Sequence, residues 1–119
     1  MRAALSRLGG VAALFSAAPA AAEPVTLDLP GPVEKLNAAY RCSDGVARDV
    51  TYVNLPENSL AIIPVDGAGR LFVSTLAASG VRYQSGALVW WTKGREATWS
   101  DETRGDQPPV TCKETDQAQ

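Results

Sequence analysis

Two turns of this chain place a polar side chain beside a glycine, Ser79-Gly80 and Lys93-Gly94. A serine beside a lysine can act as a nucleophile with its base, but only where the lysine is desolvated and has lost its proton. On an exposed turn a lysine stays hydrated and protonated, and a protonated amine is not a base. We therefore interpret the pair as a protruding polar probe. A Ser–Lys hydrolase is the catalytic alternative, and ordinary turn chemistry is the interpretation that needs no function.

Other catalytic and metal-binding patterns are missing from the sequence. There is no histidine, the commonest general base and metal ligand, and no glycine-rich phosphate loop or dinucleotide fingerprint. Asp101, Glu102 and Asp106 lack the ligand spacing of a calcium loop, which indicates a solvated loop. Arg104-Gly105-Asp106 spells an adhesion tripeptide, but three residues recur by chance. We expect neither a metal nor a cofactor.

The elements that must position the two turns are short β-prone runs separated by turn residues. The predicted strands are 37–43, 47–54, 58–65, 69–76, 80–84, 87–92, 95–100 and 109–113. Runs this short and this evenly spaced favour an all-β sandwich or barrel, and closing the sheet removes its exposed edges. We predict a small antiparallel eight-stranded β-barrel over residues 37–113. The two turns flank one hairpin, whose own turn is Ser85-Gly86, so they should lie at the same end of the barrel.

Apolar and aromatic side chains should fill the barrel. The residues predicted to do so are Trp90, Trp91, Trp99, Phe72, Tyr83, Leu71 and Ile62. Because neighbouring strand residues face opposite sides, one indole of Trp90-Trp91 must nevertheless lie on the outer face or the rim, where a tryptophan is typical of an interface anchor. Pro64 lacks a backbone N–H, which predicts a strand edge or a bulge at that position.

The N-terminal region is predicted to be a secretory signal peptide over residues 1–22. Arg2 and Arg7 precede a short apolar run, and Ala20-Ala21-Ala22 fits the small-residue cleavage pattern. The run is too short for a membrane span, and it contains no cysteine that could be lipidated. We expect a soluble periplasmic product without a stable membrane anchor. An extended, proline-rich arm would follow over 23–36, and residues 114–119 would form a disordered tail.

The two cysteines, Cys42 and Cys112, lie near the two ends of the predicted barrel. In an oxidising compartment such a pair is most simply a disulfide, which would contribute about 4 kcal/mol in the chain-entropy model. Two free thiols are the alternative.

The net charge of the chain indicates which classes of binding partner it favours. Taking Arg2 and Arg7 from the 11 basic side chains leaves nine against 13 acidic ones, a net charge of −4. An acidic chain without a basic patch is a poor nucleic-acid binder. It would attract a cationic protein, although modest acidity also serves solubility alone.

Taken together, these residues resemble the bacterial membrane-bound and periplasmic inhibitors of c-type lysozyme. The resemblance covers roughly Tyr40 to Cys112. Its marks are Tyr40-Arg41-Cys42, Ser79-Gly80 with Tyr83, Trp91-x-Lys93-Gly94, Ala97 and Cys112. Trp99 departs from the pattern, because an aliphatic or smaller aromatic residue is expected there. The missing lipidated cysteine favours the soluble periplasmic branch.

The resemblance implies a β-barrel with a Cys42–Cys112 disulfide and a non-enzymatic inhibitor of c-type lysozyme. The residues that it implies for lysozyme binding are Ser79, Gly80, Arg82, Tyr83, Lys93 and Gly94. Lys93 would pair with the enzyme's catalytic aspartate, and Ser79 would hydrogen-bond its catalytic glutamic acid. The two carboxyl groups of the enzyme lie about 5 Å apart. Arg82 and Tyr83 would brace the serine loop or extend the contact. A periplasmic ligand-binding or envelope-assembly barrel that uses its interior is the alternative function.

Overall fold

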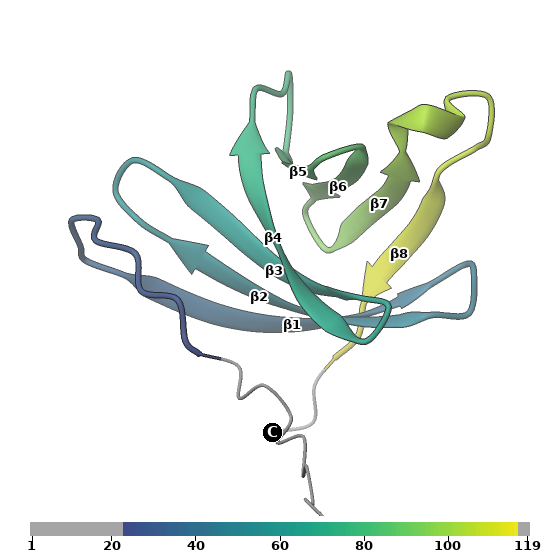
Figure 1. Cartoon of the computed structure of the whole chain (residues 1–119). Coiled ribbons are helices and arrows are strands. Elements are labelled where there is room, and N and C mark those ends of the chain that lie inside the picture. The colour runs from purple at the N-terminus through teal and green to yellow at the C-terminus, as the bar shows by residue number, and fades with distance from the viewer. Residues whose placement is uncertain (1–22, 117–119) are drawn as a thin grey trace, which may run out of the picture.

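Eight antiparallel strands follow one another around a closed barrel, and the last strand pairs with the first (Figure 1). The computed structural model describes residues 23–116, so the predicted signal peptide and residues 117–119 of the predicted tail lie outside it. The strands are β1 (Glu34–Cys42), β2 (Ala47–Asn54), β3 (Ser59–Val65), β4 (Ala68–Thr75), β5 (Val81–Ser85), β6 (Leu88–Lys93), β7 (Glu96–Asp101) and β8 (Val110–Glu114). A 3₁₀ turn, η1 (Glu102–Arg104), lies between β7 and β8. The predicted eight-stranded barrel is confirmed.

The barrel extends slightly beyond the predicted boundaries. β1 begins at Glu34 and β8 ends at Glu114, so both strands take up residues that were assigned to the arm and the tail. The backbone N–H of Thr115 also donates to the carbonyl oxygen of Ala39 at 2.8 Å. Residues 23–33 contain no helix or strand, and no helix within residues 23–116 is long and apolar enough to cross a membrane.

Strand alternation selects the side chains of the core. The largest fully buried side chains are Trp90, Phe72, Ile63, Val50 and Cys112, with Ala61 and Ala97 beside them. Aromatic contacts run through the centre, for example between Tyr40 and Trp90, whose ring centroids are 4.9 Å apart in an edge-to-face arrangement. This packed centre fixes the strands that carry the turns.

The predicted core was wrong at three positions. Ile62 and Leu71 are exposed on the outer face, and Trp91 is half-buried there. Their strand neighbours Ile63, Phe72 and Trp90 take the interior positions. Runs that are apolar on both faces do not show which alternate set points inward. The prediction therefore named both neighbours at Leu71-Phe72 and Trp90-Trp91, and it named the outward one at Ile62.

Pro64 lies at a local strand edge, as its missing N–H predicted. β3 pairs with β2 only from Ser59 to Ile62, whereas its pairing with β4 continues to Val65. At Pro64 the strand therefore has one hydrogen-bonding neighbour, and the missing donor faces no ladder on the other side.

The disulfide joins the two strands that close the barrel. Cys42 of β1 and Cys112 of β8 stand opposite one another in the ladder, with Cα atoms 4.0 Å apart, and their sulfurs are bonded. This confirms the predicted disulfide over the free-thiol alternative. The bond encloses 70 positions of sequence, so it should stabilise the fold by about 4 kcal/mol through the unfolded chain.

A buried arginine fills the end of the barrel near the β1–β2 turn. Arg48 is 7% exposed, and its guanidinium lies 4.7 Å from the ring centre of Trp99. Asp44 accepts from both terminal nitrogens of Arg48, at 3.2 and 2.9 Å, and from the backbone N–H of Val46. The hydrogen bonds from Arg48 lower the pKa of the Asp44 carboxyl group. The cation is therefore both stacked and paired.

Candidate protein-binding rim

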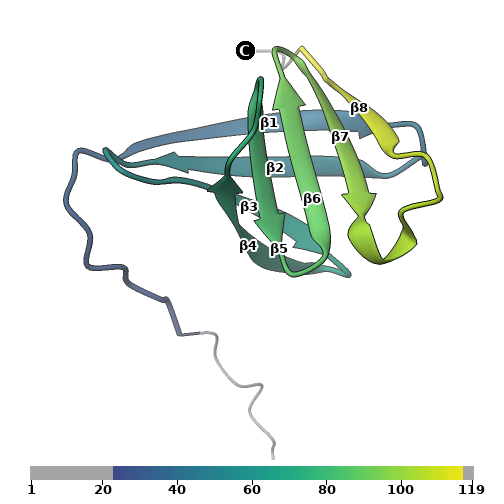
Figure 2. The same cartoon turned by 90° about the horizontal axis from the view of Figure 1, so that it is seen from above.

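The two polar turns lie at the same end of the barrel, as the strand order predicted. Residues 76–80 connect β4 to β5, and the turn at Gly94 connects β6 to β7. Figure 2 shows both connections at one end, near the end of β8. We call residues 76–80 and 93–96 the rim loops. Ser79, Gly80, Lys93 and Gly94 are all exposed on them.

The rim loops touch at Gly80. Its φ is +68°, and a Cβ atom there would lie 2.1 Å from the carbonyl oxygen of Thr92 and 2.8 Å from Cγ of Lys93. Only glycine combines this backbone conformation with so close an approach. Gly80 thus brings the serine loop directly against the strand end that carries Lys93.

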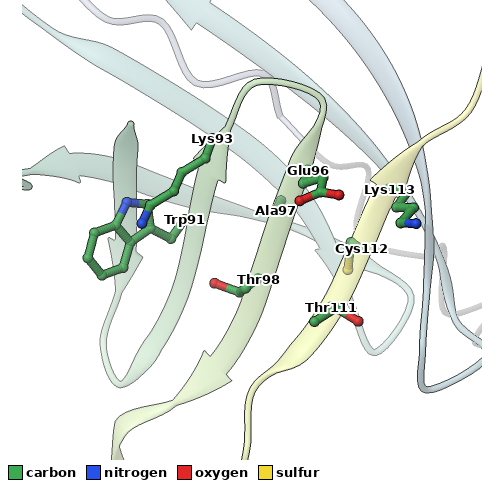
Figure 3. A pocket seen from close by; sticks show the side chains of 8 residues that line it. All are labelled: Trp91, Lys93, Glu96, Ala97, Thr98, Thr111, Cys112 and Lys113. Carbon is green, nitrogen blue, oxygen red and sulfur yellow. The ribbon is translucent and has the colours of Figure 1, made fainter. Parts of the chain in front are cut away.

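Trp91 connects the same two loops on the outer face. Its indole N–H donates to the carbonyl oxygen of Ser79 at 2.8 Å. The Lys93 ammonium lies 4.9 Å from the centre of the Trp91 ring, and Figure 3 shows the lysine side chain reaching back over the indole. A cation over an indole face is a favourable contact. One side chain therefore fixes the serine loop and supports the lysine.

Arg82 lies on the outer face beside this tryptophan. It stands opposite Trp91 in the β5–β6 ladder, with its guanidinium 6.0 Å from the ring centre. It donates to Thr75 Oγ1 at 3.0 Å and to Gln84 Oε1 at 2.9 Å, and it forms an ion pair with Glu102. This network leaves Arg82 bracing the strand beneath the serine loop.

Tyr83 lies inside the barrel and not on the outer rim. Its side chain is 4% exposed and packs 5.6 Å, centroid to centroid, from the ring of Tyr52. Burial, together with neighbouring Tyr52, raises the pKa of Tyr83 to about 12. Of the six residues predicted for binding, the structure brings Ser79, Gly80, Lys93 and Gly94 together at the rim. Arg82 lies behind them and Tyr83 beneath them.

Comparison with known proteins decides the family. Residues 40–108 match the family described as membrane-bound lysozyme-inhibitor of c-type lysozyme, MliC. A membrane-bound lysozyme inhibitor of C-type lysozyme from Pseudomonas aeruginosa is 40% identical over 93 residues, which span 74% of this chain and 73% of that protein. The chain belongs to the MliC family.

Further relatives agree with this membership. A protein of the same name from Cupriavidus necator is 47% identical over 62 residues, which span 52% of this chain and 50% of that protein. The crystal structure of Pseudomonas aeruginosa MliC in complex with hen egg white lysozyme is similar with a TM-score of 0.68 and 37% identity. That match covers 79% of this chain and 98% of the crystallised one. The predicted family is therefore confirmed.

Sequence reasoning missed one rim residue of this MliC-family chain. Leu76, the first residue after β4, is 96% exposed. An apolar side chain in that position contacts nothing that would keep it from water, and it stands on the same loop as Ser79. The sequence prediction ended the strand 69–76 on Leu76, and nothing in the residue pattern showed that this side chain lies beyond the strand and faces water.

A groove beside Lys93 runs across the outer face of β6, β7 and β8. It measures about 340 Å³. Its lining consists of Trp91, Lys93, Glu96, Ala97, Thr98, Thr111, Cys112 and Lys113 (Figure 3). Within residues 23–116, no group of three or more carboxylate, cysteine or histidine side chains converges on a metal position. In this MliC-family member the rim carries an exposed cation, a hydroxyl and an exposed apolar side chain.

Proposed function

We propose that this protein inhibits c-type lysozyme by placing its rim loops in the enzyme's active-site cleft. The observation that carries the proposal is the similarity to Pseudomonas aeruginosa MliC, whose crystal structure is a complex with hen egg white lysozyme. The adjacent placement of Ser79 and Lys93 on the rim loops supports it, because both residues are exposed and accessible to a concave surface.

The chemistry of the target suits these two side chains. Lysozyme cleaves its substrate with a glutamic acid and an aspartate on either side of the scissile bond. The Lys93 ammonium pairs with the ionised aspartate, and the pairing is stronger in a water-poor cleft than at an open surface. The Ser79 hydroxyl both donates and accepts, which suits a carboxyl group that carries a proton.

The neighbouring residues give the loops their shape. Gly80 allows the serine loop to lie against Thr92, and Trp91 fixes it through the Ser79 carbonyl oxygen. Arg82 and Tyr83 brace β5 from its two faces. Leu76 adds an apolar contact to the partner, because covering this exposed side chain removes apolar surface from water. The protein acts as a binding inhibitor and forms no covalent intermediate.

The cell compartment is part of the proposal. Cleavage after Ala22 would release a soluble periplasmic protein with Glu23 at its N-terminus and a net charge of −4, which attracts a cationic enzyme. Mass spectrometry of a periplasmic extract should find the chain that begins at Glu23. Recovery of the protein only from the membrane fraction would contradict this location.

The test is a titration of hen egg white lysozyme activity with the chain 23–119, disulfide intact. Stoichiometric inhibition is expected, and Lys93→Ala should weaken binding by about 2–4 kcal/mol, the effect of removing one partner of a buried charge pair. Lys113→Ala is the matched control, because Lys113 is an exposed lysine of the same groove that does not stand on a rim loop. Ser79→Ala should cost less than Lys93→Ala.

Two outcomes would count against the proposal. If the wild-type chain leaves lysozyme activity unchanged, the function is wrong. If Lys93→Ala inhibits as well as Lys113→Ala, the function stands but the interface lies elsewhere on the barrel.

A further inference from the structure

A second concave surface opens at the rim end of the barrel, inside the ring of strands. It measures about 420 Å³. We call it the mouth cleft. Its lining consists of Leu36, Asn37, Ala38, Tyr40, Tyr52, Asn54, Tyr83, Thr92, Gly94 and Glu114. Thr92 and Gly94 also belong to the strand end and turn that present Lys93, so the mouth cleft continues directly from the rim loops.

Three tyrosines line this cleft. The hydroxyl groups of Tyr40 and Tyr52 are hydrogen-bonded at 2.7 Å, and Tyr52 also accepts from the indole N–H of Trp90 at 3.0 Å. The ring of Tyr83 is buried, but its hydroxyl forms no hydrogen bond with residues 23–116. Because no fully enclosed side-chain oxygen in that range lacks a partner, this hydroxyl reaches the open cleft. A hydroxyl that opens into a cleft and meets no protein partner has capacity left for a ligand or water.

The cleft carries negative charge only. Glu114 is the one charged residue in its lining within the described part of the chain. It stands opposite Tyr40 in the β1–β8 ladder, and its charge contributes to raising the pKa of both Tyr40 and Tyr52. Arg95 approaches Glu114 from outside, with Nε 3.9 Å from Oε2, but its terminal nitrogen is paired with Asp116. The three phenols stay neutral because burial raises their pKa values.

This set of groups recognises a cation with several N–H donors. A carboxylate and phenol oxygens accept hydrogen bonds, and aromatic rings stack on or face a cation. A guanidinium fits better than an ammonium, because it is planar, weakly hydrated and carries five donors. An anion finds no positive side chain in the lining. The position beside the rim loops indicates that the cation comes from whatever protein the rim binds.

We propose that the mouth cleft accepts an arginine side chain of the lysozyme bound at the rim, through Glu114 and the Tyr83 hydroxyl. This rests on the proposed function and deepens it. Charge is then exchanged in both directions across one interface. Lys93 reaches a carboxylate of the enzyme, and Glu114 receives a cation from it. Such crossed pairs fix the orientation of a partner and select against enzymes without the matching arginine.

The first test uses the inhibitor alone. The chain 23–119 is titrated with N-acetyl-L-arginine amide while the tyrosine ring signals are followed by NMR. The chain has three tyrosines in all, and each of them lines the mouth cleft. Saturable shifts are expected with the arginine compound. The affinity obtained from these shifts should be at least about tenfold lower with the neutral citrulline analogue or with Glu114→Gln, because one charge-assisted contact is then lost. Equal shifts with both compounds would overturn the proposal.

The second test uses hen egg white lysozyme. Glu114→Gln should weaken binding about tenfold and Tyr83→Phe about threefold, the sizes expected for a lost charge pair and a lost neutral hydrogen bond. Glu57→Gln is the control, because Glu57 is an exposed carboxylate in the loop between β2 and β3 at the same end and changes the net charge equally.

The outcomes of the two tests separate the two proposals. If Glu114→Gln binds like Glu57→Gln, the mouth cleft takes no part, even where inhibition and the Lys93 effect are as expected. If the wild-type chain does not bind lysozyme, the proposed function fails, and the arginine titration still decides whether the cleft is a guanidinium site.

Discussion

The indole N–H of Trp91 and the carbonyl oxygen of Ser79 form a hydrogen bond of 2.8 Å, so a side chain of β6 fixes the loop that precedes β5. The same indole also contacts Lys93, whose ammonium lies 4.9 Å from the centre of the ring. Both polar residues of the rim therefore depend on one indole. Trp91 is a positioning residue, because it acts on a partner through the groups that it holds.

Trp91→Phe separates the two contributions of this side chain. It keeps an aromatic face for Lys93 but removes the N–H, and it should weaken lysozyme inhibition by about 1 kcal/mol, the usual net value of one hydrogen bond. Trp91→Leu removes the face as well and should weaken inhibition further. Amide hydrogen exchange of residues 76–80 should accelerate in both variants. Inhibition by Trp91→Phe equal to that of the wild type would show that the hydrogen bond is not needed.

Gly80 and Gly94 form a matched pair for testing the contact between the rim loops. Their φ angles are +68° and +62°, so alanine is strained at both positions. A Cβ atom meets nothing within 4 Å at Gly94, whereas at Gly80 it meets the Thr92 carbonyl oxygen at 2.1 Å. Gly94→Ala should lower the free energy of unfolding by about 1–2 kcal/mol and leave most of the inhibition intact.

Gly80→Ala carries the same strain and must also push the serine loop away from Thr92. Urea unfolding should show a larger loss of stability than for Gly94→Ala, and the inhibition constant should rise more steeply than stability alone explains. Equal effects of the two substitutions would mean that the close approach at Gly80 has no part in shaping the rim.

Much of this arrangement could be predicted because it depends on local rules. Hairpin connections alternate between the two ends of an up-and-down barrel, which placed Ser79 and Lys93 at one end. Period-two alternation put one indole of Trp90-Trp91 outside. The same rule failed at Ile62 and Leu71, because β3 and β4 carry apolar residues on both faces and only the packed interior decides which set is buried.

Side-chain contacts between different strands could not be predicted from the sequence. Whether the Trp91 indole reaches the Ser79 carbonyl depends on the register of β5 against β6, and the length of the turn alone does not set it. The mouth cleft was even harder to predict from the sequence. Tyr40, Tyr52, Tyr83 and Glu114 come from four different strands, and they meet only when β8 pairs with β1.

Acid should weaken the fold through Asp44. Its pKa is lowered in the folded protein by the hydrogen bonds from Arg48, so its contribution to stability is present above its unfolded pKa of about 3.9. That contribution is lost as the pH falls through the lowered folded value, because protonation leaves the buried Arg48 without its counter-charge. Urea unfolding between pH 7 and pH 2 should show this loss.

Asp44→Asn should lower the free energy of unfolding at pH 7 by about 1.5 kcal/mol, the lower end of the range for a hydrogen bond to a charged group, because the Asp44 side chain is partly exposed to water. It should also flatten the decline in acid. Asp49→Asn serves as the control, since Asp49 is an exposed carboxylate on β2 next to Arg48 in sequence. If Asp44→Asn keeps the full acid dependence of the wild type, other carboxylates cause it.

Alkali should reveal the tyrosines of the mouth cleft. Burial raises the pKa of Tyr40 and Tyr52, and it raises that of Tyr83 to about 12. Because the folded values exceed the unfolded value of about 10, the stabilising contribution is complete below pH 10 and is lost as the pH rises through the folded values. Tyrosinate absorbance at 295 nm should therefore stay low near pH 10 in the native protein, and it should rise there in denaturant.

Tyr83→Phe should remove one third of the final amplitude. A native titration with all three groups ionising near pH 10 would contradict the buried, neutral phenols on which the mouth cleft depends.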